Sequence, residues 1–361
     1  MGKFSAVSSR SGIRTKGSSH EESEEKRAKR RNGQERRDAG PRQHTDELFV
    51  PSMSPLPHQQ VAFLSDGIEV AGDLWVPSGL ATDQRRPAIV IGHGFGVLKE
   101  SLLAVGEFFC RAGYVTLSID YRTFGASAGE PRGQLFPLRQ VEDFRNAVSY
   151  LQTRPDVDAD AIGIWGASFG GAIVIWTAAV DRRVKAVVAE VPVVNGRRWM
   201  QEILTSAQWD DLLVRLERDR ISRFAGASSP SIAPTSRGGE DGVIPIDDST
   251  IEYFEQFAEK TGEPLLVGAS EITLESVEKV IEFNPESVIH QIAPRPLRIV
   301  TTSGRDVIHV LEHIQDAYKL AREPKSLTLI DCDAYDVYKE PHQSECLTAA
   351  LELFRDAIPV S

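Results

Sequence analysis

The chain has 361 residues, of which 41% are hydrophobic and 26% charged, and its formal net charge is -11. This composition indicates a globular protein with a sizeable core, built as one large domain with an insertion or as two smaller domains. The negative charge argues against a general nucleic-acid binder, because phosphate binding requires concentrated positive charge, and a small-molecule ligand is expected instead.

Two further absences narrow the class of protein. No apolar run approaches the ~18 residues that a membrane-spanning helix needs, so no membrane partner is expected. Three cysteines are too few for a disulfide framework, which favours a reducing, cytoplasmic location.

Residues 1–57 are charged and almost free of large apolar side chains. This segment has too little apolar surface to bury to compensate for the conformational entropy that it would lose on folding, so we predict that it is disordered.

Residues 58–194 alternate between strand and helix patterns. Two β-rich runs joined at Asp66 and Gly67 predict a hairpin, and the later strands are continuous apolar runs typical of strands buried on both faces. Strands that alternate with helices of 10–15 residues indicate a parallel sheet covered on both sides. The predicted strands are 59–65, 68–77, 88–94, 114–121, 161–168 and 184–192, and the predicted helices are 98–113, 138–155 and 170–181.

The alternation stops at residues 195–290 and resumes at residues 291–361. The first segment offers helices at 198–221 and 249–262 and no strand of the core type, so we expect an inserted helical cap. The second offers strands at 295–304 and 325–333 and helices at 309–323 and 342–358. The fold class is therefore α/β, with a mostly parallel eight-stranded sheet. The cap carries aromatic residues that could form an apolar pocket: Trp199, Trp209, Phe224, Tyr253 and Phe254.

The strongest motif is "GASFG", residues Gly166 to Gly170. It matches G-x-S-x-G between a predicted strand and a predicted helix, a sharp turn that exposes the hydroxyl of Ser168 above the sheet. An earlier turn, "GHGFG", ends the strand 88–94. Backbone N–H groups at these two turns can hold a developing oxyanion, and we assign the N–H groups of Phe95 and Phe169 to that task.

These segments, together with "DYRTFGASAGEPRG" and "PLRIVTTSGRD", resemble the dienelactone-hydrolase-like α/β-hydrolases that include the fungal polyketide transferases. The resemblance covers nearly all of residues 58–358. It implies the α/β-hydrolase fold, a small-molecule substrate, no cofactor and no metal. It also implies a serine-dependent ester or thioester hydrolase or acyl transferase on a medium-to-large acyl group, in polyketide-type secondary metabolism. A homodimer is compatible with it.

The resemblance places the catalytic acid at Asp306, just after the strand 295–304. It places the histidine after the next strand, where this chain has Ala334. We take His342 as the leading substitute, because the loop is long enough to reach the site. His309 follows as the second candidate, and His93 and His290 remain as weaker ones.

Other interpretations of the region stay open. The carboxylates at Asp331, Asp333 and Asp336 form a polar strand exit or supply the base. The stretch "HVLEH" matches a zinc-protease pattern, although an amphipathic surface helix explains it better. The missing histidine also leaves two alternative functions. One is a lyase, for example eliminating acetate from an acetylated tetronate, and the other is a catalytically inactive binding protein.

Overall fold

The computed structural model describes residues 55–81, 83–237, 242–246, 251–252, 255–256, 258–259, 269 and 271–360. The predicted disordered segment 1–57 lies almost entirely outside these residues. So do Tyr253 and Phe254 and much of the predicted helix 249–262.

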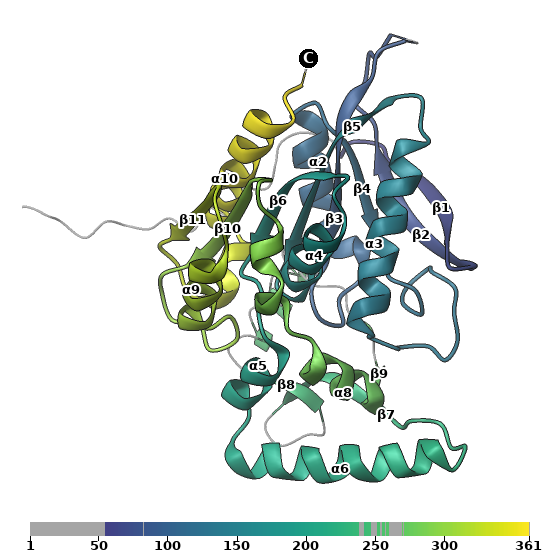
Figure 1. Cartoon of the computed structure of the whole chain (residues 1–361), viewed down its shortest axis with the longest axis vertical. Helices are drawn as coiled ribbons and strands as arrows, with labels where there is room; N and C mark the ends of the chain where they lie inside the picture. The colour runs from purple at the N-terminus through teal and green to yellow at the C-terminus, as the bar shows by residue number, and fades with distance from the viewer. Residues whose placement is uncertain are drawn as a thin grey trace, which may run out of the picture. The chain divides into compact units, whose positions relative to one another are not determined.

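A mixed, mostly parallel sheet forms the centre of the described structure (Figure 1). Among the described residues, eight strands form this sheet in the order β1-β2-β4-β3-β5-β6-β10-β11. β1 and β2 are antiparallel to their neighbours and the rest are parallel, which confirms the predicted α/β-hydrolase architecture. The strands are β1 (Gln59–Ser65), β2 (Ile68–Trp75), β3 (Arg86–Gly92), β4 (Val115–Ile119), β5 (Val157–Ala167), β6 (Val184–Glu190), β10 (Leu297–Thr302) and β11 (Lys325–Ile330).

Helices cover both faces of the sheet. α2 (Leu103–Arg111) and α10 (His342–Ala357) pack on one face, and α3 (Pro137–Gln152), α4 (Phe169–Val180) and α9 (Leu311–Leu320) pack on the other (Figure 1). Each face has its own cluster of buried side chains. Because both faces are covered, every residue of β4 is buried, as the continuous apolar strand patterns predict.

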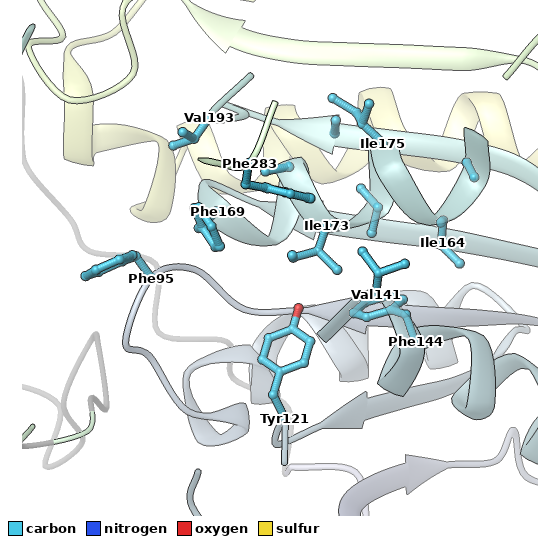
Figure 2. Close-up of a cluster of buried hydrophobic side chains, with 14 of the residues drawn as sticks. Phe95, Tyr121, Val141, Phe144, Ile164, Phe169, Ile173, Ile175, Val193 and Phe283 are labelled. Carbon is cyan, nitrogen blue, oxygen red and sulfur yellow. The ribbon is translucent and has the colours of Figure 1, made fainter. Parts of the chain in front are cut away.

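The central helix α4 is apolar on almost every side, since nearly all of its residues are buried. Figure 2 shows Phe169, Ile173 and Ile175 of α4 among side chains from the sheet and from neighbouring elements. A helix that is hydrophobic all round must be enclosed by the protein. This enclosure fixes α4 and therefore the turn that precedes it.

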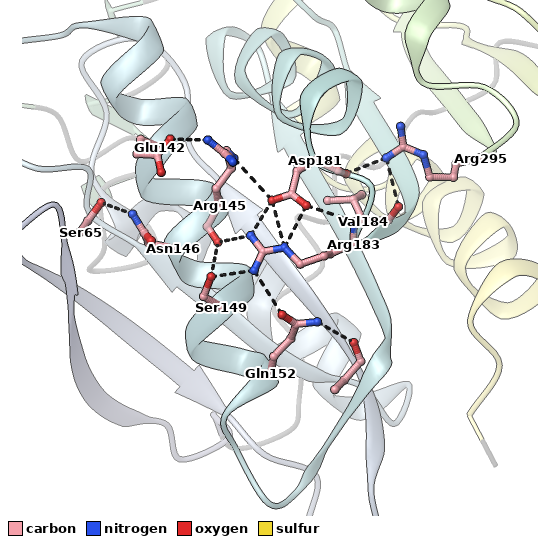
Figure 3. Close-up of polar contacts among 11 residues, drawn as sticks. Ser65, Glu142, Arg145, Asn146, Ser149, Gln152, Asp181, Arg183, Val184 and Arg295 are labelled. Carbon is pink, nitrogen blue, oxygen red and sulfur yellow. Dashed lines mark hydrogen bonds and ion pairs between the residues drawn. The ribbon is translucent and has the colours of Figure 1, made fainter.

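A polar network fixes the far end of α4 (Figure 3). Arg183 donates to Asp181 Oδ2 (2.6 Å) and to Ser149 Oγ of α3 (2.7 Å), and Arg295 donates to the carbonyl of Asp181 (2.7 Å). Burial raises the pKa of Asp181, but the hydrogen bonds and charge of Arg183 outweigh it, so the net pKa is lowered. α3, α4 and the turn before β10 are thus joined where α4 ends.

The insertion between β6 and β10 is only partly helical. It contains α5 (Gly196–Ile203), α6 (Ser206–Phe224) and α8 (Leu274–Glu282). Its described residues also form a three-stranded sheet, in the order β8-β7-β9, of β7 (Ser231–Arg237), β8 (Gly242–Ile246) and β9 (Ile272–Thr273). The expectation of a helical cap was therefore wrong in part. β7 and β8 contain Pro234 and Pro245, which conceal the usual strand pattern, and β9 has only two residues.

Short 3₁₀ turns complete the described structure. They are η1 (Lys99–Leu102), η2 (Pro285–Ser287), η3 (Ile289–Gln291) and η4 (Ala334–Tyr338). No helix of the described residues combines the length and apolarity required to cross a membrane.

Candidate active site

Ser168 lies in the sharp turn between β5 and α4. Its backbone has φ 55° and ψ -118°, a conformation that costs a non-glycine residue about 1–3 kcal/mol. The flanking glycines permit it. A Cβ atom on Gly166 would lie 2.3 Å from the carbonyl of Gly170, and one on Gly170 would lie 2.4 Å from the carbonyl of Gly92. The strained turn is held in place by the Ser168 N–H, which donates to the carbonyl of Glu190 (2.9 Å).

The loop between β10 and α9 brings a histidine to this serine. His309 Nε2 lies 3.0 Å from Ser168 Oγ, and His309 Nδ1 lies 2.9 Å from Asp306 Oδ2. The second carboxylate oxygen of Asp306 accepts hydrogen bonds from the backbone N–H groups of Ile308 (2.8 Å) and His309 (2.7 Å). Asp306 therefore shapes the loop and orients the imidazole at the same time.

The charge state of Asp306 suits an orienting carboxylate. Burial raises its pKa, but the opposite charge of His309 and the hydrogen bonds from Ile308 and His309 lower it by more, so the net pKa is below the ordinary value. Asp306 is thus ionised at neutral pH. An ionised carboxylate on Nδ1 favours the tautomer whose Nε2 can accept a proton from the serine.

His342 is not the partner of Ser168, and the expectation that it supplies the base is corrected here. It is the first residue of α10, and its Nδ1 lies 3.4 Å from Glu345 Oε2. The loop after β10 is folded around Asp306, whose Oδ1 accepts the N–H groups of Ile308 and His309. This turn brings the imidazole of His309, and not that of His342, to Ser168. His309, the second candidate, occupies the position instead.

The two weaker histidine candidates make other contacts. His93 is buried at the cavity that contains Ser168, and burial lowers its pKa to about 4. Its Nδ1 is 3.2 Å from the carbonyl of Gly94, and its ring packs against Tyr121. It therefore has the features of a neutral structural side chain. His290 belongs to the η3 turn, ahead of β10.

The exit of β11, which contains Ala334, holds the loop after β10 by hydrogen bonds. The N–H of Gly304 donates to the carbonyl of Cys332 (3.1 Å), and the N–H of Ala334 donates to the carbonyl of Arg305 (3.0 Å). Asp333 Oδ1 accepts from the N–H of Arg305 (2.6 Å). This carboxylate thus supports the acid–histidine loop from outside.

The predicted oxyanion donors, Phe95 and Phe169, lie at the two expected turns. Phe169 is the first residue of α4, where backbone N–H groups have no acceptor within the helix. Gly94 lies so close that a Cβ atom there would be 3.3 Å from Ser168 Cβ. The two phenyl rings pack edge to face with centroids 5.8 Å apart, and the ring of Trp199 lies 5.5 Å from that of Phe95.

Trp199 of α5 links the insertion to both halves of the site. Its Nε1 donates to the carbonyl of Ile308 (2.9 Å), next to His309. Trp199 was predicted to line a pocket, but its indole is buried and supports the loop that carries His309. Of the other cap aromatics, Trp209 packs under Arg197 and Phe224 is 94% exposed. None of these three lines the cavity.

A cavity of about 270 Å³ opens at Ser168 and His309. On the side of the insertion its described walls are Pro234, Thr235, Ile244, Ile246 and Ala269. On the side of α2 and α10 they are mainly Leu102, Val105, Trp165, Tyr335, Tyr338 and Leu347. The lining also includes Glu190, which sequence reasoning missed. A carboxylate at the carboxyl end of a buried parallel strand was the available signal, since ligands bind at that edge in open α/β sheets.

The stretch "HVLEH" has the geometry of a loop followed by a helix. His309 lies before α9, which begins at Leu311, so His309 and His313 do not share a helical face. The described residues contain no cluster of three or more His, Cys, Asp or Glu side chains that could hold a metal ion.

Comparison with known proteins agrees with this architecture. Residues 105–231 match the model of the prolyl oligopeptidase family. The polyketide transferase ATR5 of Stachybotrys chlorohalonatus is 33% identical over 284 residues, which span 77% of this chain and 90% of the relative. The thiohydrolase aneE of Aspergillus aculeatus is 27% identical over 281 residues, spanning 75% and 84% of the two chains.

Two solved structures extend the likeness to three dimensions. The α/β-hydrolase GrgF from Penicillium sp. sh18 has a TM-score of 0.69 at 27% identity, covering 84% of this chain and 99% of the other. DcsB, solved in complex with its substrate analogue, has a TM-score of 0.70 at 26% identity, covering 84% and 100%. The chain is therefore an α/β-hydrolase-fold enzyme that belongs to the polyketide-transferase-like group.

Proposed function

We propose that this enzyme uses Ser168 as a nucleophile to cleave an ester or thioester of a medium-to-large acyl group, and passes that group to water or to another acceptor. The observation that carries the proposal is the hydrogen-bonded chain from Ser168 through His309 to Asp306, with contacts of 3.0 and 2.9 Å. A serine, an imidazole and a carboxylate in this order are the parts that nucleophilic serine catalysis requires.

The first half of the reaction forms an acyl-enzyme. Ser168 Oγ attacks the substrate carbonyl while His309 Nε2 accepts the hydroxyl proton. The N–H groups of Phe95 and Phe169 hold the oxyanion that forms, which in comparable sites contributes about 100- to 1000-fold per donor. The tetrahedral intermediate then collapses. The leaving alkoxide or thiolate takes the proton from His309, and the acyl group stays on Ser168.

The second half frees the serine. Water, or an acceptor hydroxyl, thiol or amine, attacks the acyl-serine carbonyl and gives a proton to His309. As the second intermediate collapses, this proton returns to Ser168 Oγ, and a carboxylic acid or a transferred acyl product leaves. The names of the relatives, polyketide transferase and thiohydrolase, support a thioester of a polyketide chain as the donor.

The size and chemistry of the cavity support an acyl group as the part that is bound. Its volume of about 270 Å³ is near the lower end of ligand pockets, which run from ~300 to ~1000 Å³. Its described walls are mostly apolar, and Ser168, His309 and Glu190 are among the polar side chains that line it. An acyl chain fits this space, while a carrier or a large leaving group would remain outside it.

The main argument for the two alternative functions, a lyase and an inactive binding protein, no longer holds. Elimination by a lyase and an inactive binding protein were both considered because Ala334 stands where a base is expected. With His309 at hydrogen-bonding distance from Ser168, a missing base no longer motivates either one. Acyl transfer through the serine is therefore favoured.

The test is active-site labelling combined with thioester turnover. A fluorophosphonate probe should label Ser168 in the wild-type enzyme, and peptide mass analysis should find the adduct on that residue. Ser168→Ala should abolish labelling, and both Ser168→Ala and His309→Ala should abolish turnover of an acyl N-acetylcysteamine thioester. Turnover that survives Ser168→Ala would refute the proposal.

A further inference from the structure

Glu190 is a buried carboxyl group beside the nucleophile. It is the last residue of β6, it is 3% exposed, and it lines the same cavity as Ser168 and His309. Its backbone is tied to the site, because its carbonyl accepts the Ser168 N–H (2.9 Å) and the residue pairs with Ala167 across the sheet. Its side chain follows the alternation of β6 to the same face as Ala186 and Val188, toward α2 and α10.

No hydrogen bond to Oε2 within the described structure explains why this carboxyl group is buried. Its Oε2 atom is fully buried and has no hydrogen-bond partner among the described residues. Burial raises its pKa to about 8. The described lining of the cavity contains no lysine or arginine, so an ionised Glu190 would be an uncompensated buried charge. Buried polar groups are normally hydrogen-bonded, and an exception calls for an explanation such as a ligand.

The surroundings show which form of the group is present and what it can do. The part of the cavity toward α2 and α10, called the apolar arm below, is lined mainly by Trp165, Leu102, Val105 and Leu347. Tyr338 and Gln343 also border it. In such surroundings the neutral carboxylic acid is favoured at neutral pH. A neutral acid has one O–H donor, and Oε2 has no partner among the described residues.

The position of Glu190 limits where on a ligand its partner atom lies. Neighbouring strands of a sheet are about 4.8 Å apart, and Glu190 stands opposite Ala167, the residue before Ser168. The side chain therefore enters the cavity close to the point of nucleophilic attack. An acyl chain attached at Ser168 would pass this group within its first few carbons.

We propose that Glu190 is a specificity-determining residue, whose carboxylic acid donates a hydrogen bond to a carbonyl or hydroxyl oxygen near the reacting end of the acyl chain. This inference rests on the proposed acyl chemistry at Ser168. It adds the class of acyl group: oxygenated within the first few carbons, as in a 3-oxoacyl or 3-hydroxyacyl thioester. An unsubstituted alkyl chain would leave the donor unpaired in an apolar arm, and a site built for a polar group rejects the analogue that lacks it.

The test compares two substrates and two variants. The substrates are the N-acetylcysteamine thioesters of 3-oxooctanoate and octanoate, which differ in one oxygen. Glu190→Gln keeps a hydrogen-bond donor at nearly the same shape, whereas Glu190→Met removes it at similar size. We expect the wild type to prefer the 3-oxo substrate at least tenfold in kcat/KM, Gln to keep most of that ratio, and Met to bring it close to one.

Two further readings make the outcome decisive. The rate of Ser168 labelling by a fluorophosphonate reports whether each variant keeps an intact triad. Protection of Ser168 from labelling by each thioester gives the same substrate ratio if turnover is slow. A ratio that is unchanged in Glu190→Met, with labelling intact, overturns the role of Glu190 while leaving the acyl chemistry standing. Absence of both labelling and turnover in the wild type overturns the two proposals together.

Discussion

The exits of β10 and β11 lie side by side at the same edge of the sheet, yet they contribute to the site in different ways. The loop after β10 carries two ionisable side chains that reach the serine, Asp306 and His309. The turn after β11 carries none of these groups. It supplies backbone and carboxylate acceptors that hold the first loop, and tyrosine side chains that wall the cavity.

The comparison separates chain order from spatial order. In the related enzymes the sequence resemblance assigns acid and base to two successive strand exits, whereas here both stand on the first of them. The imidazole of His309 reaches Ser168, the proposed nucleophile, from a residue three positions after Asp306. Serine catalysis requires hydrogen bonds from the serine to an imidazole and from the imidazole to a carboxylate. A histidine at more than one position in the chain can provide this geometry.

The largest expected effect is at His309. Replacing it by alanine removes the proton acceptor of Ser168, and in serine enzymes this loss lowers kcat about a millionfold. His342→Ala is the matched control from the neighbouring exit and should leave kcat within about twofold of wild type. Steady-state and single-turnover thioester assays measure both. A larger loss of kcat in His342→Ala would indicate that His342, on the exit of β11, acts as the base.

Asp306→Asn should have the second-largest effect. The asparagine oxygen can still accept the N–H groups of Ile308 and His309, so the loop should keep its shape. The amide nitrogen would face His309 Nδ1 and select the wrong tautomer, which lowers kcat by roughly 10⁴ in comparable sites. The pH dependence of kcat, together with thermal unfolding, distinguishes this loss from misfolding. Equal activity of the asparagine variant and wild type would argue against an orienting carboxylate.

Glu190→Gln should change how stability depends on pH. The pKa of Glu190 is about 8 in the folded protein, and a glutamate in an unfolded chain titrates near pH 4.3. Between these values the folded state keeps a proton that the unfolded state has lost. The free energy of unfolding of the wild type therefore falls as pH rises, by up to about 1.4 kcal/mol per pH unit from this group alone.

The glutamine variant lacks that contribution, so its stability relative to wild type should increase from about pH 5 to pH 8 and then level off. Urea unfolding at several pH values measures the difference. Burial raises the pKa values of the neighbouring Tyr338 and Cys346 and lowers that of His93 to about 4, which moves these three groups away from the window. Parallel stability curves would mean that Glu190 titrates normally.

Asp333→Ala tests the supporting role of the β11 exit. The change removes the acceptor of the Arg305 N–H, and small displacements of catalytic groups can reduce rates by up to about a hundredfold. We expect a loss of roughly tenfold in kcat with little change in thermal stability, because the side chain of Asp333 is exposed. Asp333→Asn keeps an acceptor oxygen and should retain most of the activity. If both variants match wild type, the loop after β10 is held without this contact.

The smallest expected effect is at Ala334, the position where the resemblance predicts a histidine. Ala334→His introduces the histidine that the family resemblance implies at this position, but Ser168 already has an imidazole partner. Thioester turnover should therefore stay within about twofold of wild type. A large gain in kcat would instead mean that His309 is a poor base and that the enzyme is impaired at residue 334.

Most of the fold could be predicted from the sequence, because its signals are local. The buried strands are continuous apolar runs, and the turn at Ser168 has its glycines within two residues on either side. The strands of the insertion were not predicted because β7 and β8 contain prolines and β9 has only two residues. Their order, β8-β7-β9, depends on pairing between distant segments, which no local pattern indicates.

The site was predicted in part for a similar reason. Ser168, Asp306 and the two oxyanion turns follow from strand ends that the sequence marks. The choice between His309 and His342 depended on a contact between residues far apart in the sequence, Ser168 and His309, which no local pattern indicates. The spacing D-x-x-H was a usable signal, since an aspartate that accepts the N–H groups two and three residues ahead can also bind the imidazole at the third.

The short spacing of Asp306 and His309 also affects how such a site can be inherited and engineered. Four consecutive residues, Asp306 to His309, hold both the proposed acid and the proposed base, and the side chain of Asp306 itself forms the turn that joins them. One segment exchange would thus transfer the complete pair to a related scaffold. A pseudoenzyme screen that inspects only the last strand exit would score this chain as inactive, although its serine faces an imidazole at 3.0 Å.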